Sequence, residues 1–305
     1  MIRSTRIDNL SPTGGARYQA TGTRATSGFN SLLNVSSSHS SHSTAVARGV
    51  SSFANDASLT AVFGEQLADL YDLVQRSQFV FGSPLGPIQV AQRSLHLPRF
   101  VYFGPHTSDV SLRLAFTAGL DHRDLRSTLA LLHLVEQIAL KPDLGQGLNL
   151  SFFPLVDVLG LASLAADRNL ASVNWSQTNE PEINLLEQDA RLSGYHGFVR
   201  LETARSHDVA TVRLRFAPND YPTPEVELVS SDDFEPFAVR WESDTGHPPV
   251  DGPLSIAGDL GVAPFELTLR LPAAWPAEQY REATASILKR FIVRYRGFLA
   301  YGQNL

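Results

Sequence analysis

The chain has no cysteine among its 305 residues. This absence excludes disulfide bonds, thiolate-bound zinc, iron–sulfur clusters and cysteine nucleophiles, because each of them needs a thiol. Any metal site must therefore be built from His, Asp or Glu side chains. The sequence contains 9 His and 31 Asp plus Glu residues, so composition alone permits such a site.

Other absences narrow the functional classes further. No run of about 18 apolar residues occurs, so we expect no membrane span and no membrane partner. The formal net charge is −6, and no basic stripe points to a nucleic-acid partner. The first residues lack the apolar core of a secretory signal, so we expect a cytoplasmic protein. Neither a Gly-x-Ser-x-Gly elbow nor a phosphate-binding glycine loop is present, so serine hydrolases and nucleotide-binding proteins have no support.

The N-terminal part of the chain differs in composition from the rest. Serine accounts for 10 of the 30 residues from Ser31 to Thr60, and such a segment buries little apolar area against its ordering entropy. We expect residues 1–57 to form a flexible or loosely packed segment and residues 58–305 to form one α/β domain. His39 and His42 lie in the serine tract, but a His-x-x-His pair alone is weak evidence for a metal site.

The rest of the chain alternates between strand and helix patterns. Residues 111–118 alternate apolar and polar side chains as a strand does, residues 125–140 form an apolar helical run, and residues 148–154 fit a second strand. A strand–helix–strand unit gives a parallel sheet with a right-handed crossover. Residues 218–263 are predicted to form long loops. Further strands are predicted at 79–82, 87–91, 197–203, 210–216 and 265–271, and further helices at 59–77, 180–192 and 276–299.

Several short motifs follow these elements in a fixed order. The motifs are Gly119-Leu-Asp-His-Arg-Asp124, Pro154 to Gly160, Asp167-Arg-Asn169, Asn174-Trp175, Glu180-Pro-Glu182, Leu201-Glu202 and Thr268-Leu-Arg-Leu-Pro272. Together they resemble the zinc carboxypeptidase family, including its succinylglutamate desuccinylase and aspartoacylase-like deacylases, from about Phe79 to the C-terminal helix. The resemblance implies an α/β fold with a mixed, largely parallel sheet, helices on both faces and a pocket at the carboxyl ends of the strands.

The resemblance also implies that the residues of a catalytic zinc site have been replaced. Family members place a His-x-x-Glu pair after one strand and a further His ligand at a later strand end. Here Asp121 occupies the position of the first His, Asp124 that of the Glu and Glu202 that of the last His. Arg270 occupies the position of the catalytic Glu, and an arginine cannot lose its proton to act as a general base. The usual zinc-dependent mechanism is therefore not available from these residues.

Two interpretations of the acidic positions are open. In the favoured one, the guanidinium of Arg270 is the counter-ion of Asp121, Asp124 and Glu202, because its five donors can bridge several carboxylates. In the other, the acids bind a hard cation such as Mg²⁺, Ca²⁺ or Mn²⁺, which prefers oxygen ligands. We therefore expect no cofactor, with a divalent metal (Zn, Mn or Mg) as the alternative.

Two further residues are candidates for ligand binding. Arg168 and Asn174 match positions that bind the substrate carboxylate in the family, and together with Arg270 they form the predicted pocket. Paired N–H groups of an arginine bind a carboxylate well, although a structural salt bridge of Arg168 is an equally good interpretation.

These patterns favour a catalytically inactive relative of carboxypeptidases or deacylases, with a binding or regulatory role. Its partner would be a small-molecule ligand, a peptide ligand or another protein. The alternative is an active metal-dependent peptidase, or an amidohydrolase of the N-acyl amino acid deacylase type, with a rearranged metal site. That site would use His122, His207 and Glu202.

Overall fold

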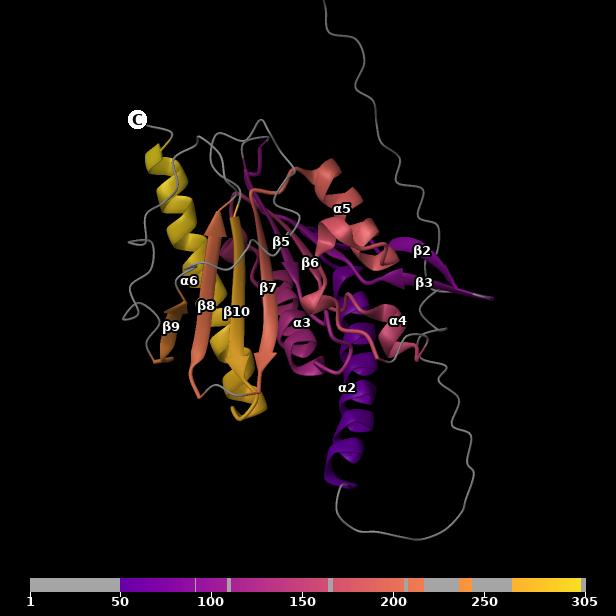
Figure 1. The fold of residues 1–305 in the computed structure, drawn as a ribbon. Coiled ribbons are helices and arrows are strands. Elements are labelled where there is room, and N and C mark those ends of the chain that lie inside the picture. Colours follow the sequence, from indigo (N-terminus) through magenta and orange to yellow (C-terminus); the bar gives the residue numbers. More distant parts are fainter. Residues whose placement is uncertain are drawn as a thin grey trace, which may run out of the picture.

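The computed structural model describes residues 50–90, 92–108, 111–163, 167–205, 208–216, 236–242 and 265–302. These residues form an eight-stranded mixed sheet in the order β1-β4-β6-β5-β7-β10-β8-β9, and a two-stranded sheet of β2 and β3 (Figure 1). The strands are β1 (Val80–Gly82), β2 (Leu85–Val90), β3 (Arg93–Leu97), β4 (Phe100–Phe103), β5 (Leu112–Thr117), β6 (Leu148–Phe153), β7 (Gly197–Ala204), β8 (Ala210–Phe216), β9 (Val239–Glu242) and β10 (Phe265–Pro272).

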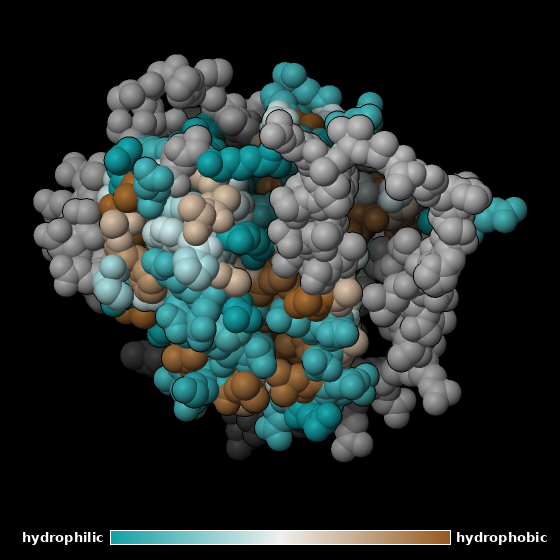
Figure 2. Space-filling model, turned by 90° about the horizontal axis from the view of Figure 1, so that it is seen from below, coloured by the Kyte–Doolittle hydropathy of each residue, from teal (hydrophilic) through white to brown (hydrophobic). Residues whose placement is uncertain are grey.

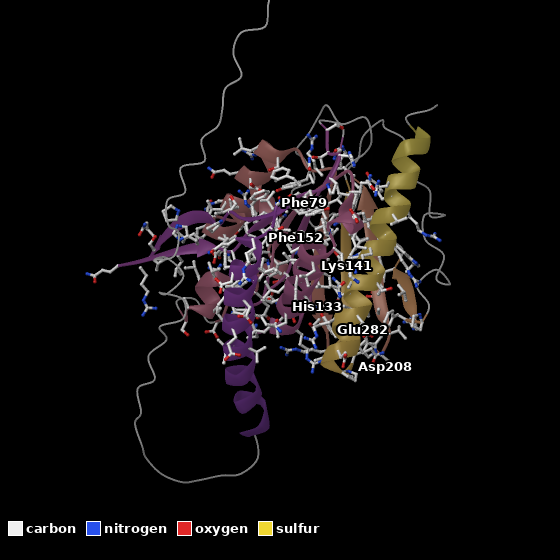
Figure 3. The ribbon with its side chains drawn as sticks, turned by 180° about the vertical axis from the view of Figure 1, so that it is seen from behind. Phe79, His133, Lys141, Phe152, Asp208 and Glu282 are labelled. Carbon is white, nitrogen blue, oxygen red and sulfur yellow. The ribbon has the colours of Figure 1, made fainter. Side chains whose placement is uncertain are left out.

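Helices cover both faces of the large sheet, which confirms the expected fold class. One face carries α2 (Val50–Val74), α3 (Leu125–Leu140) and α6 (Ala277–Gly302). Figure 3 shows the molecule from behind, with this face towards the viewer and with His133 of α3 and Glu282 of α6 labelled. The other face carries α4 (Val158–Leu161) and α5 (Pro181–Ser193). Within the described ranges, no helix has a stretch long and apolar enough to cross a membrane. Short 3₁₀ turns complete the described elements: η1 (Pro142–Gly145), η2 (Leu170–Ser172) and η3 (Trp175–Gln177).

The central strands and the crossover helix form where the apolar pattern predicts them. All but one residue in each of β5 and β6 is buried, as parallel strands covered on both faces require. Helix α3 begins after Asp124, whose side chain accepts a hydrogen bond from the backbone of Ser127. It ends at Leu140, just before Lys141 and Pro142, because proline cannot continue a helix. The predicted helix at 125–140 is therefore confirmed.

Other elements differ from the expectation. Helix α2 begins at Val50, inside the segment expected to be loosely packed, and residues 1–49 lie outside the described ranges. Strands β3 and β4 were not predicted, and β9 lies within the stretch predicted to be loop. These three strands have only four or five residues each, which is too short for an alternating pattern to stand out.

The strand order brings three carboxyl ends together. Strand β5 pairs in parallel with β6 on one side and with β7 on the other. The connection after β5 therefore leads to one side of it, and the connection after β6 passes to the other side. Such a change in direction leaves a crevice outside the carboxyl ends of the strands, where α/β proteins commonly bind ligands.

His196 connects three strands at their amino ends, opposite to the carboxyl ends described above. Its Nδ1 accepts a hydrogen bond from the backbone N–H of Arg113 at 3.1 Å. Its backbone N–H donates to the carbonyl of Arg113, and its carbonyl accepts from Phe265. Burial lowers the pKa of His196 to about 4, and the positive charge of Arg113 acts in the same direction. The imidazole is therefore neutral in the folded protein near pH 7.

This neutral histidine predicts acid sensitivity. Below its ordinary pKa of about 6.5, His196 gains a proton in the unfolded chain but not in the folded protein, so stability falls as the pH falls from 6.5 towards 4. We expect the free energy of unfolding to drop by about 2 kcal/mol between about pH 7.5 and pH 5 from this group alone. Urea denaturation across this range measures the loss, and a His196→Gln variant, which keeps an acceptor without titrating, should show a shallower decline. An equal decline in the variant would contradict the prediction.

Candidate functional site at the carboxyl ends of the strands

The carboxyl ends of β7 and β10 place Glu202 and Arg270 side by side. The two residues are register partners in the parallel pair of strands, so their side chains leave the same face of the sheet. The Nε of Arg270 donates to Oε2 of Glu202 at 2.9 Å. Its NH1 lies 3.4 Å from Oε2 of Glu242, in the edge strand β9. One guanidinium therefore joins two carboxylates from different strands.

Asp124 is a half-buried carboxylate whose contacts hold the fold together. It caps α3 through the backbone N–H of Ser127, at 3.3 Å. It also accepts the backbone N–H of Thr203 at 2.8 Å and the Thr203 hydroxyl. That hydroxyl lies 2.9 Å from the hydroxyl of Tyr280, at the start of α6. Burial raises the pKa of Asp124, against the lowering effect of these donors. The residue thus joins the start of α3, which follows β5, to the end of β7.

Asp121 has a different partner again. The Nε and NH2 groups of Arg123 donate to its two carboxylate oxygens at 2.8 and 2.9 Å, and the backbone N–H of Arg123 adds a third bond at 3.0 Å. The expectation that Arg270 neutralises all three acids is therefore corrected. Arg270 pairs with Glu202. Asp124 instead binds Ser127 and Thr203, and Asp121 binds Arg123. Asp121 and Asp124 lie in the turn after β5, so their side chains do not follow the alternation of the strand.

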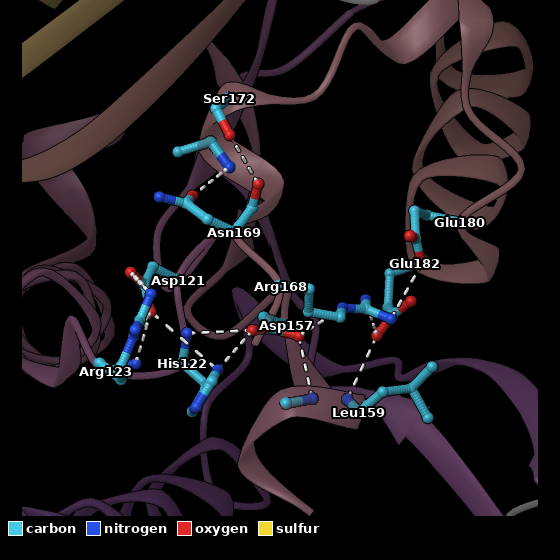
Figure 4. Close-up of polar contacts among 12 residues, drawn as sticks. Asp121, His122, Arg123, Asp157, Leu159, Arg168, Asn169, Ser172, Glu180 and Glu182 are labelled. Carbon is cyan, nitrogen blue, oxygen red and sulfur yellow. Dashed lines mark hydrogen bonds and ion pairs between the residues drawn. The ribbon is translucent and has the colours of Figure 1, made fainter. Parts of the chain in front are cut away.

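Arg168 lies at the centre of a buried ionic network, shown in Figure 4. Its Nε lies 3.0 Å from Asp157, its NH1 2.9 Å from Glu180 and its NH2 2.6 Å from Glu182. The side chains of Asp157 and Glu182 are fully buried. Burial raises the pKa of Glu182, although the bond to Arg168 and its charge oppose this effect. Of the two interpretations of Arg168, the structure supports the salt bridge, since three carboxylates already surround the guanidinium.

His122 extends the same network. Its Nδ1 lies 2.7 Å from Oδ2 of Asp157, and its backbone N–H donates to the same oxygen at 3.1 Å. The other oxygen of Asp157 accepts from the backbone of Gly160 at 2.9 Å, which caps α4. The pattern that could have revealed Asp157 is its position as the one charged residue in an apolar run, Leu155 to Leu159, because buried charges need partners.

Two predicted residues, Asn174 and His207, remain to be placed. Asn174 precedes η3, and its backbone carbonyl accepts from Gln177 at 3.2 Å. His207 lies outside the described residues. Figure 2 views the molecule from below, the side towards which β7 and β10 point in Figure 1. Hydrophilic side chains predominate there, with apolar ones interspersed.

The residues at this edge do not fit a catalytic zinc ion. Such a site needs three ligands converging on one point, with an open fourth position. Within the described part of the chain, no group of three His, Asp or Glu side chains is arranged to hold a metal ion. Glu202 instead faces a guanidinium, Asp124 accepts three N–H or O–H bonds, and Asp121 faces Arg123.

No protein-family model matches the sequence, and no curated protein matches it. Solved structures nevertheless share the fold. A metallo-carboxypeptidase from Burkholderia cenocepacia superposes with a TM-score of 0.58 and 15% identity, over 77% of this chain and 69% of that one. A metallo-carboxypeptidase from Pseudomonas aeruginosa gives 0.53 and 16%, over 75% and 68%. A Shewanella baltica protein assigned as a metallopeptidase gives 0.53 and 17%, over 76% and 90%. The chain therefore has the fold of metallo-carboxypeptidases, and at these identities the likeness extends to the fold alone.

Proposed function

We propose that this chain is a ligand-binding protein built on a carboxypeptidase-like fold, and that it does not catalyse metal-dependent hydrolysis of peptide or amide bonds. The observation that carries the proposal is the ion pair of Arg270 with Glu202 at the ends of β10 and β7. In the family that this chain resembles, these two positions hold the general base and a metal ligand. A guanidinium cannot accept a proton, and a carboxylate held by it is a poor ligand for a cation.

The surrounding contacts support the same conclusion. Asp124 caps α3 and binds Thr203, and Arg168 is surrounded by carboxylates of its own chain. Residues that would otherwise bind a metal or a substrate carboxylate instead stabilise the fold. The strand order is still the one that favours a ligand-binding crevice outside the carboxyl ends of the strands. A small molecule or a peptide is the ligand class that such a crevice suits, and a protein partner is the alternative.

A metal-loading experiment tests the proposal. The purified chain is incubated with Zn²⁺ or Mn²⁺, desalted and measured for metal content, then assayed against peptides and N-acyl amino acids. We expect no stoichiometric metal and no hydrolysis, because no set of ligands converges at the site. One equivalent of retained metal, with hydrolysis that disappears on chelation and returns on reloading, would overturn it.

One observation favours the alternative of an active hydrolase. The Nδ1 of His122 lies 2.7 Å from the buried carboxylate of Asp157, which can accept its N–H, and metal-binding histidines are commonly oriented by such a carboxylate. The same experiment decides between the two functions. If metal is retained, a His122→Ala variant should lose it, whereas under our proposal this variant changes neither metal content nor hydrolysis.

A further inference from the structure

The sheet face opposite α6 carries a row of polar side chains that includes two arginines. Arg200 in β7 is the register partner of Thr268 in β10, and Thr268 is the partner of Arg213 in β8. Register partners project from the same face of a sheet. Phe265 projects from the other face, where its ring contacts Phe291 of α6. Arg200, Thr268 and Arg213 therefore form one transverse row on the face that α6 does not cover.

The acids on this face already have arginine partners. Glu266 lies 3.0 Å from NH1 of Arg200, and Glu202 and Glu242 lie 2.9 and 3.4 Å from Arg270. Glu242 is the register partner of Arg213, yet its carboxylate is directed to Arg270 instead. The ion pairs on this face are thus complete without Arg213.

Arg213 is left with an uncompensated charge. Its side chain is half-buried, its Nε is buried without a hydrogen-bond partner, and within the described ranges it makes no ion pair. The Nε of Arg200, a residue that is only 4% exposed, also makes no hydrogen bond, and it lies 4.0 Å from Oε1 of Glu202. Removing a guanidinium from water without a partner is costly. The unpaired charge of Arg213, with an Nε that lacks a hydrogen bond on each arginine flanking Thr268, therefore points to an anionic ligand.

We propose that Arg213, together with Thr268 and the Nε of Arg200, binds a carboxylate group of this protein's ligand. The proposal rests on the proposed binding function and names the ligand class. Neighbouring strands lie about 4.8 Å apart, and β10 separates the strands of the two arginines. Their Cα atoms are therefore roughly 10 Å apart, and both side chains can reach an anion above Thr268. The guanidinium of Arg200 is held over the ring of Trp175, 5.6 Å from its centroid, and also donates to the carbonyl of Ala171 at 3.1 Å.

The charges on the face favour a carboxylate over a phosphate. Arg213 supplies one unpaired positive charge, which a monovalent carboxylate neutralises. A phosphate carries nearly two negative charges at pH 7, and the second would be repelled by Glu202, Glu242 and Glu266. The planar fork of a guanidinium also matches the two oxygens of a carboxylate.

Titration calorimetry with simple probes tests the site. N-acetyl-alanine carries one carboxylate and its amide carries none, so the wild-type chain should bind the acid and not the amide. N-acetyl-trialanine distinguishes a peptide C-terminus from a free small acid, and inorganic phosphate tests the dianion. Binding of either carboxylate supports the proposal; equal binding of acid and amide, or a preference for phosphate, overturns it.

Matched variants locate the binding. Arg213→Met should weaken binding of the acid about tenfold or more, because a hydrogen-bonded ion pair is lost. Arg213→Lys keeps the charge and the fold but loses the fork, so it should give a smaller loss. Arg240→Met, an exposed arginine on the neighbouring strand β9, should leave affinity unchanged. Unchanged binding in both Arg213 variants, or an equal loss in Arg240→Met, would overturn the site. Because these assays do not involve metal or hydrolysis, their failure is distinct from failure of the proposed function.

Discussion

Replacing Arg168 with methionine is expected to lower the free energy of unfolding by about 3–5 kcal/mol, the usual effect of removing one partner from a buried ion pair. The guanidinium contacts Asp157 and Glu182, both fully buried, and the better exposed Glu180. Without it, two carboxylates remain in a site that water cannot reach. Urea denaturation near neutral pH measures the loss, provided that the slope with denaturant is unchanged.

The control and the pH dependence identify the cause. Arg191 on α5 is 73% exposed and lies 3.9 Å from Glu187, so Arg191→Met should change stability by less than about 0.5 kcal/mol. Burial raises the pKa of Glu182, and a proton would remove its unpaired charge. The loss in Arg168→Met should therefore shrink as the pH falls to about 5, and adding Glu182→Gln should restore part of it. A loss no larger than that of Arg191→Met would contradict this account.

Elements with a strong local pattern could be predicted from the sequence. The helix at 125–140 has apolar residues along its whole length and is bounded by Asp124 and Pro142. The strands at 197–203 and 265–271 match β7 and β10 within a residue. Strands β3, β4 and β9 form because a neighbouring strand offers them hydrogen bonds. That contribution comes from tertiary structure, and no local window of sequence contains it.

The site was predicted less completely, for a related reason. The position of Arg168 could be recognised from its motif, but its partners come from the β6–α4 loop and the start of α5. Only the folded chain brings Asp157, Glu180 and Glu182 together. Asp121 and Asp124 follow the same strand, yet one faces Arg123 and the other Thr203. Their sequence spacing gave no indication of this difference, because an irregular turn does not follow the periodicity of a strand or helix.

The ion pair of Arg270 and Glu202 was expected from the sequence motifs, but the pairing of the strands adds a further contact. Both residues could be named as replaced positions, and an attraction between them was expected from their charges. The contact with Glu242 was not expected, since β9 was not predicted. The exposed fractions of the three side chains are 28% for Arg270, 18% for Glu202 and 28% for Glu242. Solvent therefore screens this cluster partly, and its charges interact more weakly than those around Arg168.

Arg270→Glu is expected to destabilise the protein by about 3 kcal/mol, because it places a third carboxylate between two others and removes their shared cation. Arg270→Met removes the cation without adding repulsion, so its loss should be smaller, roughly 1–2 kcal/mol. Chemical denaturation at low and high salt separates the two effects, since salt should weaken the repulsion in Arg270→Glu. Combining Arg270→Glu with Glu202→Arg exchanges the charges across the register pair and should recover part of the stability. If the Glu and Met variants lose equal stability and salt does not separate them, Arg270 contributes packing alone, and the ion pair on which the proposed function rests would no longer explain why an arginine occupies this strand end.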